Sequence, residues 1–423
     1  MTNAFLMIGF WPIELLAIIW AVRRSGFLPF PHGTMLYLFT AQIVLALHAY
    51  GFLYYSFVRI FSTYAYIHHF SSMFLLQAIM LFSLCLLVPK SSISIGESVR
   101  TLKVKDSVFW IFIVVFYFCW LVTSLCIDWS IVWSNSIYLT MTDPEKALVI
   151  NNGLTRLIFT LVGPFGLVGA AALSFTMCSG RLRLSLALIP IMTWSFFFAL
   201  SAHSRGSAAY LILAGLIAAM FPRARVAAVG LMVVGFLTTL SVLWGRGSGN
   251  HGLASLPTYF SNIVAYYDVS GLDAVSNVYE GIFVTAEYFS RTFQFNNLYK
   301  ILSFSPLVSF IDGYDTARDL YAIRLAAYVP NSAVSEVLSF GTPYAMLYFG
   351  VFLWSGYYSA KTLSKSPTLL TLGLNTLMFF GSYLQFAYDT RTNFRSFFYI
   401  GLICWFIIRR QRQMTSTMAL RRP

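Results

Sequence analysis

The chain has 423 residues, of which 58% are hydrophobic, 18% aromatic and only 10% charged, and its mean hydropathy is +0.72. These values exclude an ordinary soluble domain and predict a membrane protein that crosses the bilayer many times. The formal net charge of +13 does not indicate a nucleic-acid partner, because no contiguous basic patch lies within a soluble segment. The sidedness of membrane connectors explains the charge better.

Taken in chain order, the apolar runs predict an all-α polytopic protein with about eleven transmembrane helices. They cover residues 3–21, 35–57, 70–88, 108–126, 157–177, 184–200, 207–221, 226–243, 333–357, 369–385 and 394–408. Residues 1–244 therefore hold the first eight helices and residues 333–408 the last three. Residues 245–332 form one long loop, and residues 409–423 form a basic tail.

The connectors between these helices predict the orientation. One alternating set carries most of the 28 basic residues and is expected on the cytoplasmic side. The N-terminus is then outside and the C-terminus inside. The first basic pair, Arg23 and Arg24, follows the first apolar run instead of preceding it, so we expect no cleaved signal peptide. The cytoplasmic set comprises Arg23, Arg24, Lys90, Arg100, Lys103, Lys105, Arg181, Arg183, Arg223, Arg225, Lys361, Lys365, Arg409, Arg410, Arg412, Arg421 and Arg422.

The long loop is rich in aromatic and charged residues and contains none of the 5 cysteines, so disulfides do not hold it together. It has little low-complexity sequence, which argues against a disordered linker. Apolar residues recur at helical spacing in two stretches, from Leu272 to Ile282 and from Leu320 to Ala327. This spacing predicts two or three short amphipathic helices on the periplasmic side.

Arginines on the outer side give the sharpest functional signal. Arg205 lies in a very short connector, Arg391 and Arg395 lie in the connector before the last helix, and the loop adds Arg318 and Arg324. The planar guanidinium matches phosphate oxygens in pairs and stays charged at every physiological pH. The pattern predicts a phosphate or pyrophosphate site at the membrane surface.

Each of these arginines also has an alternative role. Its side chain could extend to anionic lipid headgroups, or it could pair with a nearby carboxylate. The outer-face carboxylates available for such pairs are Asp312, Asp315, Asp319 and Asp389.

Candidate general bases are Asp389, Glu336, His203 and, in the loop, His251. Each also has a structural alternative. Glu336 falls in the first turn of a helix and would favour its dipole there, with Asn331 or Ser332 as the cap. His203 could close the end of a helix, and Asp389 could merely position Arg391. No metal or cofactor is expected, because no His, Cys or Asp cluster has ligand spacing.

Three segments resemble the bacterial O-antigen polymerase (Wzy) family. They are the connector Ser204-Arg205-Gly206-Ser207, the segment from Pro330 to Gly341 after the long loop, and the terminal Thr390-Arg391 with Arg395-Ser396-Phe397-Phe398-Tyr399. The related O-antigen ligases usually carry a His-Asn pair near the end of the loop, whereas here Asn331 follows Pro330. That difference favours a polymerase and leaves the ligase as the alternative.

The resemblance implies a glycosyltransferase C type fold in the bacterial inner membrane, acting at the periplasmic face. The growing glycan would pass from undecaprenyl pyrophosphate onto a lipid-linked repeat unit. The implied partners are these lipid-linked glycans and membrane lipid, with a chain-length regulator and a flippase of the same pathway. The resemblance assigns pyrophosphate binding to Arg205, Arg391, Arg395, Arg318 and Arg324, and the base to Asp389, Glu336 or His203 in that order.

Two other classes fit less well. A transporter or flippase for the same units would carry charged residues inside the bundle and repeated halves. Glu14 is the lone acid within a predicted span, and no repeat is visible. A scaffold that binds partners through its loop would need no arginine for glycan synthesis.

Overall fold

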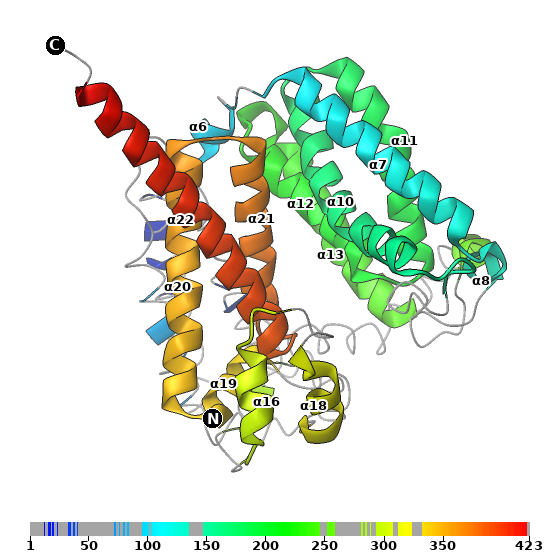
Figure 1. Ribbon diagram of the computed structural model, residues 1–423. Coiled ribbons are helices and arrows are strands. Elements are labelled where there is room, and N and C mark those ends of the chain that lie inside the picture. Colours follow the sequence, from blue (N-terminus) through cyan, green and yellow to red (C-terminus); the bar gives the residue numbers. More distant parts are fainter. Residues whose placement is uncertain are drawn as a thin grey trace. The chain divides into compact units, whose positions relative to one another are not determined.

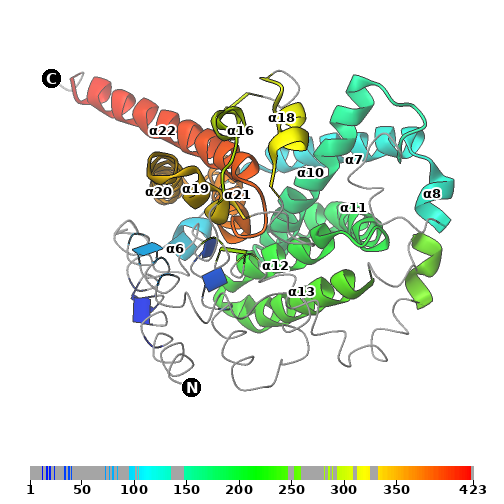
Figure 2. The same ribbon diagram turned by 90° about the horizontal axis from the view of Figure 1, so that it is seen from below.

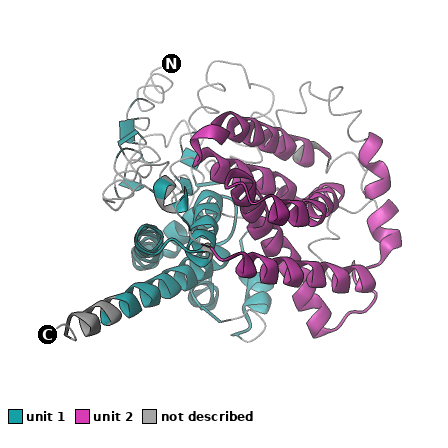
Figure 3. Ribbon diagram, turned by 90° about the horizontal axis from the view of Figure 1, so that it is seen from above, with its two compact units in different colours: residues 1–102, 276–423 teal, residues 103–275 magenta. Residues whose placement is uncertain are grey.

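The computed structural model describes residues 104–134, 147–245, 252–258, 293–307, 312–323 and 332–420, together with 95–100, 102 and scattered positions before residue 84 and between 281 and 288. Within these residues the structure is helical and has no strand, with one isolated bridge between Ile127 and Leu148. The chain divides into two compact units (Figure 3). Unit 1 comprises residues 1–102 and 276–423, and unit 2 comprises residues 103–275. The predicted all-α class is confirmed for the described part of the chain.

Unit 2 is built around a set of packed helices in which α10 contacts α7, α11 and α12, and α12 contacts α13. Small residues allow the last pair to approach closely, as is common between membrane helices. A Cβ added at Gly235 would lie 2.7 Å from Ile212 Cγ1, and one at Gly215 would lie 3.0 Å from the Ala228 carbonyl oxygen. The helices are α7 (Asp106–Cys126), α8 (Trp129–Ser134), α10 (Gly153–Cys178), α11 (Leu182–Ser201), α12 (Arg205–Ala219) and α13 (Arg225–Gly245), with 3-10 turns η2 (Pro222–Ala224) and η3 (Leu253–Ser255).

Among the described residues of unit 2, four segments are long and apolar enough to cross a membrane. On α7 the outward face is apolar, since Ile111 and Leu125 have 65% and 72% of their surface exposed. The inward face carries the buried Phe116 and Trp120. A helix that is apolar all round suits a lipid surround better than water. The four segments are Asp106–Cys126, Gly153–Cys178, Leu182–Ser201 and Pro222–Val242.

Unit 1 holds three long helices, α20, α21 and α22, that pack against one another (Figures 1 and 2). The side of α22 facing α20 is tight, because a Cβ at Gly401 would overlap the Trp354 ring. The short helices α16 and α19 both contact α22 near its start, and α18 contacts α16. The helices are α6 (Ile95–Arg100), α16 (Asn297–Ser303), α18 (Tyr314–Tyr321), α19 (Ala333–Phe340), α20 (Thr342–Lys365), α21 (Leu369–Leu384) and α22 (Thr390–Leu420).

Two helix predictions need correction in unit 1. The single span expected at 333–357 is two helices, because the chain breaks at Gly341, where φ is 109°. Such a backbone angle suits glycine, and Pro343 lies in the first turn of the next helix, where proline is tolerated. The last span, expected at 394–408, continues as α22 from Thr390 to Leu420, so the basic tail starts inside a helix.

The second amphipathic stretch expected in the loop is also placed wrongly. The apolar spacing predicts an amphipathic helix from Leu320 to Ala327, but Leu320 is 68% exposed and α18 ends at Tyr321. Residues 324–327 lie outside the described residues. The buried residues of α18 are Tyr314 and Ala317. Most of the spans expected at 3–21, 35–57 and 70–88, and the stretch from Leu272 to Ile282, lie outside the described residues.

Candidate functional site

A polar cluster lies where α22 begins, in unit 1, and Arg391 is its centre. The side chain of this arginine is 1% exposed. Its Nη2 donates to both carboxylate oxygens of Asp312, at 3.0 and 2.8 Å, and to the Leu307 carbonyl oxygen at 2.8 Å. Its Nη1 donates to the Leu302 carbonyl oxygen. Arg391 therefore holds two segments of the long loop against the start of α22.

The ion pair between Arg391 and Asp312 is shielded from water, since the Asp312 side chain is only 7% exposed. Burial raises the pKa of the Asp312 carboxyl, but hydrogen bonds from Ser305 and Arg391 outweigh that effect and hold the pKa below its usual range. The guanidinium carbon of Arg391 also lies 4.2 Å from the centre of the Tyr314 ring. This cation–π contact adds an attraction that is strongest where water is excluded.

Asp389 lies immediately before α22 and caps it. Its Oδ1 accepts a hydrogen bond from the Thr392 backbone N–H at 3.0 Å, and its Oδ2 accepts one from the Tyr314 hydroxyl at 3.2 Å. A carboxylate at this position satisfies a free N–H group and complements the helix dipole. Asp389 is half-buried, so its remaining lone pairs face a partly open surface.

Glu336 joins α19 to α22. The side chain is 1% exposed, Oε2 accepts the Thr390 backbone N–H at 2.8 Å, and Oε1 accepts the Tyr299 hydroxyl at 2.9 Å. The predicted cap is confirmed at Ser332, which accepts from the Ser335 N–H at 3.0 Å. Glu336 lies in the first turn of α19, where it favours the dipole of that helix, and it also contacts the start of α22.

Two tyrosines connect these carboxylates. The Tyr299 and Tyr314 rings are stacked with their centres 5.8 Å apart, and they share a core with Phe295 and Phe340. Burial raises the pKa of both hydroxyls, and the negative charges of Glu336 and Asp389 add to that increase. Both hydroxyls are therefore neutral donors at ordinary pH. Asp312 was expected only as a carboxylate that could pair with an outer arginine, and its ion pair with Arg391 confirms that alternative role. Tyr299 was not predicted, because its partner Glu336 lies far along the chain.

The remaining outer arginines of unit 1 are more open. Arg395 Nη1 donates to the Leu307 carbonyl oxygen at 3.3 Å, one turn along α22 from Arg391. Arg318 is 49% exposed and pairs with Asp319 at 3.2 Å and with Asp315 at 3.7 Å, as the alternative role predicted. Arg324 lies outside the described residues, as do His251, Glu14 and Asn331.

His203 and Arg205 belong to unit 2, in the turn between α11 and α12. His203 is 2% exposed and has φ of +48°, a left-handed conformation that a helix end usually gives to glycine. Its N–H donates to the Leu200 carbonyl oxygen at 2.9 Å, and the Ser204 N–H donates to that of Ala199 at 2.8 Å. This pair of bonds is the Schellman motif, so the predicted alternative role for His203, closing a helix, is confirmed.

Arg205 is the first residue of α12 and is half-buried, with Ser204 as the cap. A positive side chain there opposes the helix dipole, which favours an anion at that end instead. The structure brings Arg391, Arg395, Asp389 and Glu336 together within unit 1, and His203 with Arg205 within unit 2. That the two sets share one site stays a prediction.

Within the described ranges, no three His, Cys, Asp or Glu side chains are arranged to hold a metal ion. No protein-family model, curated protein or solved structure matches the chain. The function must therefore be argued from the residues themselves.

Proposed function

We propose that the chain is a membrane glycosyltransferase of the O-antigen polymerase type, which joins glycan repeat units carried on undecaprenyl pyrophosphate. The observation that carries this proposal is the cluster at the start of α22. There the segment after the long loop contributes Glu336, the terminal segment contributes Asp389 and Arg391, and the loop contributes Asp312 and Tyr314. Segments far apart in the sequence thus supply paired carboxylates and a guanidinium to one small region.

The charges of α20 and α22 support a membrane position for unit 1. Thr362 donates to the Cys404 carbonyl oxygen at 3.3 Å, so the two helices run in register there. Lys365 and Arg409 accordingly lie toward the same end, opposite Asp389 and Arg391. From Thr390 to Ile408, α22 rises about 28 Å, close to the thickness of the hydrocarbon core. We place the end with Arg409 in the cytoplasm and the cluster at the periplasmic face, following the positive-inside rule.

The chemistry assigned to this cluster is glycosyl transfer. An acceptor sugar hydroxyl attacks the anomeric carbon of the donor glycan, the bond from that carbon to the pyrophosphate oxygen breaks, and the hydroxyl proton passes to a base. Asp389 suits the base best, because it is half-buried and each carboxylate oxygen retains a lone pair. Both oxygens of Glu336 are held inside the protein, which suits a positioning role.

Arg391 is assigned to the departing pyrophosphate, whose negative charge grows as the bond breaks. In this structure its Nη2 donates to the Asp312 carboxylate, and its Nη1 donates to the Leu302 carbonyl oxygen. A phosphate oxygen is also an anion that binds guanidinium in pairs, so it would take the place of Asp312. Phosphate binding would then release the loop segment around Asp312, and loss of pyrophosphate would let the segment return.

The test uses a strain that lacks the gene and is complemented with variants at matched protein level. Arg391→Ala should abolish long polysaccharide chains on a lipopolysaccharide gel and leave lipid A core with a single repeat unit. The matched control is Arg156→Gln, since Arg156 is exposed and predicted on the same membrane face. Normal chain lengths with Arg391→Ala would refute the proposal.

The strain that lacks the gene, without complementation, distinguishes a polymerase from a ligase and from a flippase. A deletion that leaves one repeat unit on the core indicates a polymerase. A core with no repeat unit indicates a ligase or a flippase instead. These two differ in the side on which lipid-linked units accumulate, which is periplasmic for a missing ligase and cytoplasmic for a missing flippase.

A further inference from the structure

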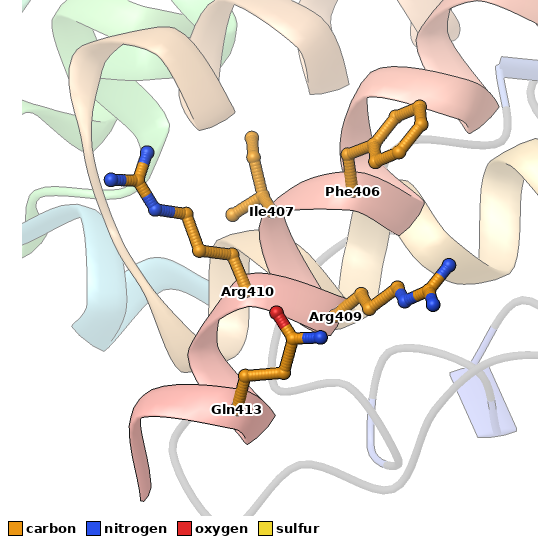
Figure 4. Close-up of a pocket in the computed structure, with 5 residues that line it drawn as sticks. All are labelled: Phe406, Ile407, Arg409, Arg410 and Gln413. Atoms are coloured by element: carbon orange, nitrogen blue, oxygen red, sulfur yellow. The ribbon is translucent and has the colours of Figure 1, made fainter. Parts of the chain in front are cut away.

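A pocket of about 540 Å³ lies on α22 at the end opposite the polar cluster (Figure 4). It is lined by residues of one stretch of the helix only. Phe406 and Ile407 form the apolar part, and Arg409, Arg410 and Gln413 form the polar part. The pocket does not belong to the site described above, which begins some 28 Å away along the helix axis by the rise per residue.

Helical spacing explains how these five residues share one pocket. Gln413 follows Arg410 by three positions and Arg409 by four, so it neighbours both on the helix surface. Figure 4 shows the two arginines extending to either side with Gln413 between them. Phe406 and Ile407 lie one turn earlier, toward the apolar part of the helix. The pocket therefore changes from apolar to cationic within two turns.

Within the part of the chain that the structure describes, no carboxylate neutralises the two arginines. Both are exposed, and neither has an acidic partner among the described residues. The guanidinium of Arg409 lies 5.3 Å from the centre of the Trp405 ring, which orients it without cancelling its charge. No aspartate or glutamate follows Asp389 in the sequence. Two exposed guanidinium groups on neighbouring residues, with no carboxylate nearby among the described residues, attract an external anion.

The apolar part is equally uncovered. The Phe406 side chain is 54% exposed, and Ile403, one turn earlier, is 41% exposed. An inorganic anion would use the arginines and leave these side chains in water. A molecule with a phosphate at one end and hydrocarbon at the other would cover the arginines and the apolar side chains together. Its phosphate would lie at the cationic part of the pocket and its hydrocarbon at the apolar part, in their order along α22.

We propose that this pocket binds the headgroup of an anionic phospholipid from the cytoplasmic leaflet. The phosphate accepts hydrogen bonds from Arg409, Arg410 and the Gln413 amide, while the first part of an acyl chain lies along Phe406 and Ile403. The proposal requires that α22 crosses the membrane, but it does not depend on glycosyl transfer. Anionic lipid would then fix the depth and rotation of α22 in the bilayer.

The test counts lipids that stay bound when the full-length protein is released from nanodiscs of phosphatidylglycerol and phosphatidylcholine into native mass spectrometry. The double variant Arg409→Gln with Arg410→Gln should weaken phosphatidylglycerol retention by about fivefold for each arginine removed. The matched control is Arg421→Gln with Arg422→Gln, which removes the same charge further along the chain. The control should retain phosphatidylglycerol as the parent protein does.

Two results would overturn the proposal. Equal losses in the two double variants would show that overall charge, and not this pocket, attracts the lipid. Displacement of phosphatidylglycerol by millimolar inorganic phosphate or glycerol phosphate would show an anion site that does not use the hydrocarbon. Retention of phosphatidylcholine, which has no net charge, should be the same in every variant.

Discussion

Replacing Asp312 by alanine should release the loop from the start of α22, because the substitution leaves the Arg391 charge buried without its partner. The two side chains are only 1% and 7% exposed, so water cannot solvate the guanidinium unless the segment moves. Breaking one side of a buried ion pair costs about 3–5 kcal/mol. Arg391 still donates hydrogen bonds to the Leu302 and Leu307 carbonyl oxygens, which places the expected loss at the lower end of this range.

The assay is hydrogen exchange of the purified protein in nanodiscs, followed by mass spectrometry of peptides from α16 and α18. A loss of about 3 kcal/mol corresponds to an increase of about two orders of magnitude in exchange rate if the helices open locally. Peptides from α10 and α11, in unit 2, should exchange at the parent rate. They report whether the whole protein has been destabilised.

The loop itself supplies a matched control. Arg318 and Asp319 form an ion pair of the same chemistry with side chains 49% and 71% exposed. Asp319→Ala should change exchange by less than about 1 kcal/mol, because exposed pairs contribute little. A double variant, Asp312→Leu with Arg391→Met, should restore most of the protection that Asp312→Ala loses. Equal exchange in the Asp312 and Asp319 variants would refute the reasoning that the buried pair holds the loop.

The other predictions concern the turn after α11, the tyrosine pair and helix packing. His203→Gly should change thermal stability by less than about 1 kcal/mol, because relief of the φ of +48° is offset by loss of a side chain that is only 2% exposed. A loss of polysaccharide in this variant would then report a chemical role of the imidazole, and unchanged polysaccharide would exclude one. Tyr299→Phe leaves one oxygen of Glu336 without its donor and should cost about 1–3 kcal/mol in thermal unfolding, whereas an unchanged transition would contradict the hydrogen bond at 2.9 Å. The raised pKa of Tyr299 gives stability that is complete below about pH 10 and decreases above it, as the unfolded hydroxyl ionises first. A melting temperature of the parent protein that stays constant from pH 9 to 11 would contradict this role of Tyr299. An equal fall of the melting temperature in Tyr299→Phe over the same range would contradict it too. Gly401→Val should separate α20 from α22, since even a Cβ there overlaps the Trp354 ring, and should cost at least about 1–3 kcal/mol in the same measurement.

The long helices of unit 2 follow from local composition, and the sequence predicted their bounds to within a few residues. Residues 108–126 were expected to span the membrane, and α7 runs from Asp106 to Cys126. An apolar run is a local property of the sequence, so a membrane helix can be predicted from it without knowledge of distant contacts. The break at Gly341 was also readable, because glycine followed two positions later by Pro343 marks the end of one helix and the start of another. It was missed because the apolar residues continue through the break.

The site was predicted less completely, for a physical reason. Arg391 and Asp389 were identified from their charge and their position on a short connector. Asp312 was one of four carboxylates expected to be available for an arginine, but the sequence did not indicate which of them pairs with Arg391, because Asp312 lies 79 positions earlier in the chain. Helical periodicity carries no information about such a pairing. The same holds for Tyr299 and Glu336, whose contact forms only when the loop packs on α19 and α22.

The continuity of α22 gives the protein a mechanical connection between its two ends. The helix begins beside Arg391 and runs without a break to Leu420 (Figure 1), a rise of about 46 Å. A helix of this length bends only gently, so it acts as a stiff lever when either end is displaced. In the proposed membrane placement, a movement of the loop that tilts the end of α22 beside Arg391 would swing Arg409 at the opposite end, and a spin label at Gln413 would report that movement.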